Sequence, residues 1–355
     1  MPRHGNISNY GLHLPSMRFL TVDAIFVTSP LEKHKSASRT RLVYGSFRVL
    51  FGVLTAPIGR VKLLIQCQDE MIKSGRLPKP SLLIVLAKQF TIPLYRLPKP
   101  YKGIVNCFAR TIGNEGFRSL WRGYIPGVIS DVSFRVISFG FNNYFLTLTN
   151  FKKDKDGYWK WLLGGLGGGI FANLATHFVV YPLDYAQTRL ANDIKTNNKI
   201  EERQFKGLID VYKKTIRSGG IAGLYRGFAI SCCKSLLSTG VYFGIHVIFR
   251  PFMLHWVRSQ DDFLAAPVMA VGVAVCQKMA TYPLDTVNRR MMMTSGEVKY
   301  QSSMHAFAEI IRNEGVKSLY KGGGACILEK ITLSVILTVF VTRLHDYFPQ
   351  RSLIL

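Results

Sequence analysis

The sequence predicts an all-α membrane protein in which six transmembrane helices form three pseudosymmetric repeats. Two observations predict this fold: a set of six apolar segments, and two sequence landmarks that each occur three times. The chain has 355 residues, of which 48% are hydrophobic and 19% are charged. A chain this apolar is not intrinsically disordered. Its net charge of +25 indicates attraction to anions, which include nucleic acid, anionic lipid and anionic solutes.

The six segments differ in how strictly they exclude charge. Segment 161–183 contains no Asp, Glu, Lys or Arg, and about 20 apolar residues suffice for a helix to cross a bilayer. Segments 40–66 and 263–287 carry isolated charges, and shorter apolar segments follow Val136, Ser235 and Ile331. A charge in lipid is costly unless it faces a bundle interior or a watery cavity. We therefore expect the six helices to surround a polar path.

Two landmarks define the repeat. Pro57, Pro182 and Pro283 each lie near the end of an apolar segment, where proline is expected to kink the helix. Later in each unit, two glycines seven residues apart enclose an aromatic-basic-glycine turn, at 116–123, 220–227 and 315–322. Each unit is thus a kinked helix, a basic linker, a short helix, a turn and a second helix.

These landmarks divide the chain into repeats and flanking segments. Residues 1–38 contain neither a spanning segment nor a targeting pattern, so we expect a flexible tail. The first linker is lengthened by the proline-containing stretch 68–100, which is either a partner-binding insert or a tolerated bulge. The predicted units are an N-terminal extension (1–38), three repeats (39–149, 150–258 and 259–348) and a C-terminal tail (349–355).

The repeated pattern resembles the mitochondrial carrier family, whose signature is Pro-x-Asp/Glu-x-x-Lys/Arg, then Asp/Glu-Gly and aromatic-Lys/Arg-Gly. The resemblance covers about residues 40–347. Within that family the third repeat is similar to ADP/ATP carriers (ADP/ATP translocases), because residues 288–293 keep five of the six residues of their Arg-Arg-Arg-Met-Met-Met hallmark. The alternative interpretation of Met291, Met292 and Met293 is gap-filling packing. Arg289 and Arg290 complete the signature.

The resemblance implies a divergent carrier that exchanges adenine nucleotides by alternating access in the mitochondrial inner membrane. It would be a monomeric, multi-pass secondary transporter (an antiporter) and not an enzyme. The net positive loops on the proline side agree with a matrix location for those loops. Two alternatives stay open: a carrier of another anionic or zwitterionic metabolite, and a non-transporting membrane scaffold. Nucleophile-elbow, Walker and metal-ligand patterns are missing from the sequence, and the basic residues follow the loops of a membrane bundle, which disfavours nucleic acid.

Residues seven positions past each turn glycine are expected at one depth, about 10 Å into each second helix of a repeat. They are Ser130, Lys234 and Glu329. Charge at membrane depth is a functional-site hypothesis, and the alternative is a structural ion pair such as Glu329 with Lys234. By the resemblance, Ser130 and Glu329 replace phosphate-binding arginines, and Gly52 replaces a cavity lysine. The predicted substrate-binding residues are Ser130, Asp131, Arg135, Lys234, Lys278, Glu329 and Lys330.

The resemblance also implies a gate on the matrix side, made of salt bridges between the first helices of neighbouring repeats. Of these bridges, Lys62–Asp285 can still be ionic and Asp184–Asn288 can be a hydrogen bond. Carboxylates are absent from the opposite ends of the second helices, which leaves Arg250 and Arg343 unpaired. We therefore expect the balance between the two states to be altered. The predicted gate residues are Pro57, Gly59, Lys62, Pro182, Asp184, Gln187, Pro283, Asp285 and Asn288.

The turns that open helices are expected to bind lipid phosphate. Free backbone amides at a helix start form an anion site, and in the family such turns hold cardiolipin. The alternative is that glycine merely permits the turn. Bound cardiolipin is the one cofactor-like ligand expected, with no metal. The predicted cardiolipin-binding residues are Lys102, Gly103, Arg122, Gly123, Lys206, Gly207, Arg226, Gly227, Lys321 and Gly322.

Overall fold

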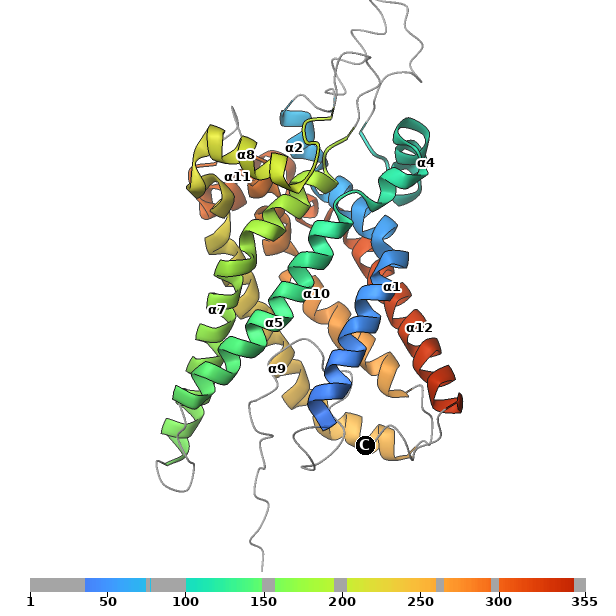
Figure 1. Ribbon diagram of the computed structural model, residues 1–355, viewed down its shortest axis with the longest axis vertical. Coiled ribbons are helices and arrows are strands. Elements are labelled where there is room, and N and C mark those ends of the chain that lie inside the picture. The colour runs from blue at the N-terminus through green and yellow to red at the C-terminus, as the bar shows by residue number, and fades with distance from the viewer. Residues whose placement is uncertain are drawn as a thin grey trace, which may run out of the picture.

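The computed structural model describes residues 36–74, 77, 100–148, 157–194, 203–259, 265–294 and 300–347, and every regular element within them is helical. Short helices lie between pairs of long helices along the chain (Figure 1). The described long helices are α1 (Ser36–Gln66), α5 (Tyr124–Leu148), α7 (Tyr158–Ala191), α9 (Phe228–Ser259), α10 (Ala265–Met293) and α12 (Gly323–Tyr347). The short helices are α2 (Gln68–Lys73), α4 (Ile104–Glu115), α8 (Leu208–Gly219) and α11 (Ser303–Glu314).

The described helices occur in the same order in each of the three predicted repeats. Each has a long helix, a short helix, a 3₁₀ turn and a second long helix, in the orders α1-α4-η2-α5, α7-α8-η3-α9 and α10-α11-η4-α12. The 3₁₀ turns are η2 (Phe117–Trp121), η3 (Ile221–Tyr225) and η4 (Val316–Tyr320). The short helices gather at one end of the molecule, and the long helices diverge toward the other end (Figure 1).

Neighbouring repeats are joined by long helices that run alongside one another. The second helix of each repeat packs along the first helix of the next: α5 along α7, α9 along α10, and α12 along α1. The last contact closes the bundle into a ring. Among the described residues, we find no helix with both the length and the apolar character needed to cross a membrane.

Two predicted segments extend into the described structure, and the others lie outside it. Helix α1 already begins at Ser36, inside the segment predicted as a flexible tail, while residues 1–35 lie outside the described residues. The predicted insert 68–100 begins with helix α2, and its residues 75–76 and 78–99 lie outside the described residues. The C-terminal tail 349–355 also lies outside, as do the side chains of Arg250 and Arg343.

The aromatic-basic-glycine turns require glycine for two reasons: the backbone conformation and the lack of room for a side chain. Gly123, Gly227 and Gly322 have φ angles of 83°, 85° and 83°, which L-residues with a side chain rarely adopt. A Cβ atom on Gly123 would lie 2.9 Å from the backbone nitrogen of Ala191, and one on Gly322 would lie 3.0 Å from the carbonyl oxygen of Lys62. Each turn therefore packs directly against the first long helix of the next repeat.

The three consecutive methionines at the end of α10 tie the repeats together. Met291 packs in the hydrophobic cluster of the third repeat, Met292 in that of the second and Met293 in that of the first. Successive helical residues point about 100° apart, so one helix end reaches three separate cores. All three are at most 5% exposed, and burying each stabilises the fold by roughly 1.5–3 kcal/mol. The packing interpretation of these methionines is thus confirmed.

Candidate functional site: a cavity closed by contacts between repeats

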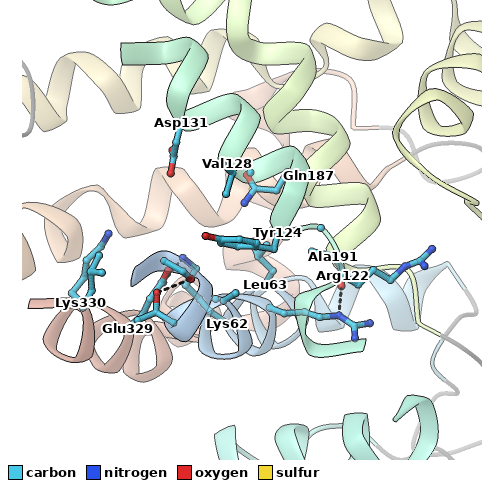
Figure 2. A pocket seen from close by; sticks show the side chains of 18 of the residues that line it. Lys62, Leu63, Arg122, Tyr124, Val128, Asp131, Gln187, Ala191, Glu329 and Lys330 are labelled. Carbon is cyan, nitrogen blue, oxygen red and sulfur yellow. Dashed lines mark hydrogen bonds and ion pairs between the residues drawn. The ribbon is translucent and has the colours of Figure 1, made fainter. Parts of the chain in front are cut away.

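A cavity of about 160 Å³ is lined by residues of α1, α5, α7, α10 and α12 and by the turn that follows η2. Figure 2 shows Lys62 and Glu329 joined across it, with Tyr124 beside them and Lys330 and Arg122 at opposite sides of the view. Basic lining residues outnumber acidic ones, so the cavity favours an anionic ligand. Its charged lining residues are Arg60, Lys62, Arg122, Arg135, Arg289 and Lys330, with Asp131 and Glu329.

Each residue at the predicted seven-past position contacts the first helix of the next repeat. The Ser130 hydroxyl donates a hydrogen bond to Asp184 Oδ1 at 2.5 Å. Each of the other two contacts is an ion pair, with N–O distances of 3.0 and 2.8 Å. We call these contacts the helix ring: Ser130–Asp184 between α5 and α7, Lys234–Asp285 between α9 and α10, and Glu329–Lys62 between α12 and α1.

The gate pairs that we predicted are wrong. Lys62 does not pair with Asp285 but with Glu329, and the side chain of Asp184 accepts from Ser130 and not from Asn288. The second helices α5, α9 and α12 each pack along the first helix of the following repeat. Their side chains are therefore closer to the gate positions than the side chains of any other first helix. The predicted alternative pair of Glu329 with Lys234 is also not the one observed.

Asn288 and Gln187 occupy gate positions but take other roles. Asn288 Oδ1 accepts a hydrogen bond from the Tyr181 hydroxyl at 3.0 Å. Gln187 lines the cavity, and its amide nitrogen would lie 2.5 Å from a Cβ atom on Gly127. The three prolines of the gate motif, Pro57, Pro182 and Pro283, lie inside α1, α7 and α10.

Two of the predicted substrate-binding cations share one carboxylate. Lys234 contacts Asp285 Oδ1 at 3.0 Å, and Lys278, seven residues before Asp285 on α10, contacts Asp285 Oδ2 at 3.1 Å. Their side chains are 17% and 26% exposed, whereas that of Asp285 is 4% exposed. Both lysines are therefore accessible from one side while they hold the buried acid.

The cavity lining contains residues that the sequence reasoning had not assigned to a solute. Arg289, predicted as part of the signature, lines the cavity and donates to the carbonyl oxygen of Asp184 at 3.4 Å and to Thr188 Oγ1. Tyr124 was missed. Its hydroxyl would lie 3.2 Å from a Cβ atom on Gly52, the position where the resemblance places a lysine. Its place directly after Gly123, at the start of α5, was the signal that could have identified it.

The basic residue of each aromatic-basic-glycine turn binds the following repeat. Arg122 contacts Asp193 at 2.5 Å and the carbonyl oxygen of Phe205 at 2.6 Å. Arg226 donates to the carbonyl oxygens of Thr294 and Tyr300 at 2.8 and 3.4 Å. Lys321 contacts both oxygens of Asp69, at 2.8 and 2.7 Å. These side chains bind protein groups in the structure. We call these contacts the turn ring: Arg122 with Asp193 and Phe205, Arg226 with Thr294 and Tyr300, and Lys321 with Asp69.

The other predicted lipid-binding residues lie at the starts of short helices. Gly103 and Gly207 precede α4 and α8. The backbone amide of Lys102 donates to Asn106, and that of Lys206 donates to Asp210. The side chains of Lys102 and Lys206 belong to exposed residues.

A buried arginine joins the third repeat to the insert of the first. The Arg290 side chain has no exposed surface and contacts Asp69 at 2.6 Å and Glu314 at 2.5 Å. Lys73 also contacts Glu314, at 3.2 Å, and the Tyr300 hydroxyl donates to Glu70. We call this cluster the loop network: Asp69, Glu70, Lys73, Arg290, Tyr300, Glu314 and Lys321.

The two glutamates of the loop network have opposite protonation tendencies. Burial raises the pKa of Glu70 above its usual value, although the Tyr300 hydrogen bond opposes the rise. Burial would also raise the pKa of Glu314, but the positive charge of Arg290 outweighs it and lowers that pKa to about 2. Glu314 is therefore a stabilising charged partner, whereas Glu70 tends toward the neutral form.

The three cyclic repeats, the charged contacts between them, the cavity with its excess of basic residues and the glycine turns define a carrier-type helical bundle. The family model described as "Mitochondrial carrier protein" matches residues 37–153, 158–255 and 259–352, and the chain belongs to this family. It is similar to "ADP,ATP carrier protein, mitochondrial" of Solanum tuberosum, with 47% identity over 92% of this chain and 82% of that protein. It is also similar to the rice protein of the same name (Oryza sativa subsp. japonica), with 48% identity over 91% of this chain and 79% of that protein.

Proposed function

We propose that this protein exchanges ADP and ATP across the mitochondrial inner membrane by alternating access. It is a multi-pass secondary transporter of the mitochondrial carrier family. The observation that carries the proposal is the cavity between the repeats, whose lining has more basic than acidic residues. Relatives named as ADP,ATP carriers match more than nine-tenths of the chain. A nucleotide phosphate would be attracted to such a cavity and bound by its arginines.

The location of charge in the long helices supports their placement in a membrane. Lys234 contacts Asp285 between α9 and α10, Lys278 contacts the same acid within α10, and Lys62 contacts Glu329 between α1 and α12. Charges that pair inside a bundle avoid most of the cost of exposure to lipid. We assign the end with the short helices to the matrix side, where the basic loops belong. The structure then corresponds to a carrier closed toward the matrix, and it would act as a monomer.

The residues that would bind phosphate here differ from the arginines that the family resemblance places at positions 130 and 329. Ser130 and Glu329, at positions of phosphate-binding arginines, belong to the helix ring. Arg135, Lys330 and Arg289 line the cavity instead. Lys234 and Lys278 would also bind the phosphate, once it displaces the Asp285 carboxylate from their ammonium groups. Substrate binding would thereby weaken a ring contact and favour opening toward the matrix.

Exchange in lipid vesicles tests the function directly. Purified protein in vesicles loaded with ADP should take up labelled ATP, and uptake equal to that of protein-free vesicles rejects the proposal. A thermal-shift screen of nucleotides, carboxylates and amino acids separates the alternatives, because a bound ligand raises the melting temperature. Stabilisation by a carboxylate or amino acid but not by ADP or ATP would identify another metabolite carrier.

We also propose that cardiolipin binds at the helix starts next to the turns. The side chains of Arg122, Arg226 and Lys321 are held by the turn ring, so lipid phosphate would use backbone amides together with Lys102 and Lys206. Vesicle-free protein titrated with cardiolipin should gain thermal stability. The gain should shrink in the variant Lys102→Gln/Lys206→Gln, with phosphatidylcholine as the lipid control. An equal gain with both lipids would reject this assignment.

A further inference from the structure

We propose that Glu329 is the gate carboxylate of the first repeat, supplied by α12 in place of a missing acid on α1. The gate position two residues past the motif proline is acidic in two repeats, as Asp184 and Asp285. In the first repeat it is Gly59. The role of Glu329 therefore differs from the substrate contact that the sequence predicted.

The position of the Glu329 carboxylate carries this inference. A Cβ atom on Gly59 would lie 3.3 Å from Glu329 Oε1, so the carboxylate occupies the space next to the missing side chain. The other oxygen, Oε2, lies 2.8 Å from Lys62 Nζ. Gly59 and Lys62 are three residues apart on α1, a spacing at which two side chains share a helix face. Glu329 thus places a carboxylate next to position 59 and beside Lys62, on the face of α1 where the first repeat has no acid of its own.

The charge balance of the helix ring agrees with this role. Its cations are Lys62 and Lys234, its acids are Asp184, Asp285 and Glu329, and Lys278, which shares Asp285 with Lys234, supplies the third positive charge. At the α9–α10 contact the second helix supplies the base and the first helix supplies the acid. At the α12–α1 contact this arrangement is reversed. The reversal keeps the ring neutral although Gly59 carries no charge.

A carboxylate at position 59 would crowd and repel that of Glu329. Any side chain at 59 begins within 3.3 Å of Glu329, which is closer than ordinary van der Waals contact. A glutamate at 59 would also place a second negative charge beside one lysine, and like charges at this distance repel. A carboxylate introduced at position 59 is therefore expected to compensate for the loss of the carboxylate at position 329.

A double-mutant cycle on the full-length purified protein tests whether an acid at position 59 can replace Glu329. Gly59→Glu alone and Glu329→Ala alone should each lower the melting temperature by about 3–8 °C. The double variant Gly59→Glu/Glu329→Ala should regain at least half of the summed loss, because the acid again faces Lys62. Glu309→Gln, on the exposed part of α11, is the matched control and should change the melting temperature by less than 1–2 °C. Losses that simply add in the double variant would overturn the proposal.

A second measurement asks whether the pair closes a gate and does not merely hold two helices together. Glu329→Ala should release labelled ATP from loaded vesicles into nucleotide-free buffer at least threefold faster than the unmodified protein. The reversed pair Lys62→Glu/Glu329→Lys should restore retention, and release at the unmodified rate in Glu329→Ala would refute a gating role. The role in gating rests on the proposed exchange of ADP and ATP, but the melting-temperature cycle needs no substrate. Absence of exchange by the unmodified protein would therefore reject the proposed function while the cycle still decides the pairing.

Discussion

The helix ring and the loop network both join repeats through charged side chains, but they differ in burial. In the helix ring, the side chains of Lys62, Glu329 and Lys234 are 16–20% exposed. In the loop network, the Arg290 side chain is fully buried against Asp69 and Glu314. A solute anion can therefore reach the lysines of the helix ring, but it cannot reach Arg290.

This difference indicates which contacts can break during transport. A partly exposed ion pair contributes about 0–1 kcal/mol because water solvates the separated charges. A buried charge left without its partner costs about 3–5 kcal/mol. The helix ring can therefore open at moderate cost, whereas the loop network is expected to stay intact and to hold α2, α10 and α11 together. Substitutions in the two regions should accordingly affect different properties.

Replacement of the buried arginine should have the largest effect. Arg290→Met keeps an apolar stem but leaves Asp69 and Glu314 each with one lysine partner, Lys321 or Lys73. We expect a loss of about 3–5 kcal/mol of stability, measured as a lower melting temperature and a lower yield. The matched variant Lys234→Met, in the helix ring, should lose less than about 2 kcal/mol because Lys278 still holds Asp285. Equal losses would show that the two regions do not differ as described.

The two glutamates of the loop network should respond differently to pH. The pKa of Glu314 is about 2 in the folded protein, compared with 4.5 as its ordinary value. Its stabilisation is therefore present above about pH 4.5 and is lost as pH falls toward 2. Glu314→Gln should cost about 2–3 kcal/mol at pH 7 and flatten the fall in melting temperature between pH 5 and pH 3.

Glu70→Gln is the matched control for that titration. Burial raises the pKa of Glu70, so the folded protein gains less from its charged form than it gains from that of Glu314. Its loss at pH 7 should stay within about 1 kcal/mol, with the Tyr300 hydroxyl still able to donate. A larger loss for Glu70→Gln than for Glu314→Gln would contradict the roles assigned to the two acids.

Within the helix ring, the ionic contact should matter more for transport than the neutral one. Asp285→Asn leaves Lys234 and Lys278 close together without a carboxylate. We expect ADP/ATP exchange to slow at least tenfold, which corresponds to about 1.4 kcal/mol of barrier. Asp184→Asn, whose side chain accepts from the uncharged Ser130, should slow exchange less than threefold. Initial rates in vesicles at matched protein content measure both, and the reverse order would overturn this ranking.

The sequence predicted the order of the helices and turns well because these elements depend on local sequence signals. Proline, glycine and apolar periodicity located the long helices, and the turn glycines fixed a register in which Ser130, Lys234 and Glu329 lie at equivalent places. Backbone conformation explains this success: Gly123 adopts φ of 83° where its motif demands a left-handed turn. The number of repeats therefore follows from how often the proline and glycine motifs occur in the sequence.

The partners of those residues could not be predicted in the same way. Pairing depends on which helices run side by side and how far each side chain reaches, and neither quantity is encoded in spacing along one helix. Lys62 was assigned to Asp285 because both are gate positions, but α12 lies along α1 and brings Glu329 closer. Asp69 was hidden in the predicted insert 68–100, although it binds Arg290 and Lys321.

The smallest expected effect comes from the neutral contact of the helix ring. Ser130→Ala removes the hydroxyl that donates to Asp184 at 2.5 Å. Asp184 is only partly buried, so water can replace the donor, and we expect a loss of about 1 kcal/mol.

A double-mutant cycle isolates this contact from other effects of the substitution. If the hydroxyl acts through Asp184, Ser130→Ala should cost less in a background that already carries Asp184→Asn. The melting temperatures of the four proteins give the coupling. Independent losses at the two sites would mean that the α5–α7 contact rests on apolar packing, and that ionic chemistry distinguishes only the α9–α10 and α12–α1 contacts. The helix ring would then have two functional contacts instead of three, and closure at the third would depend on the shape of the helices.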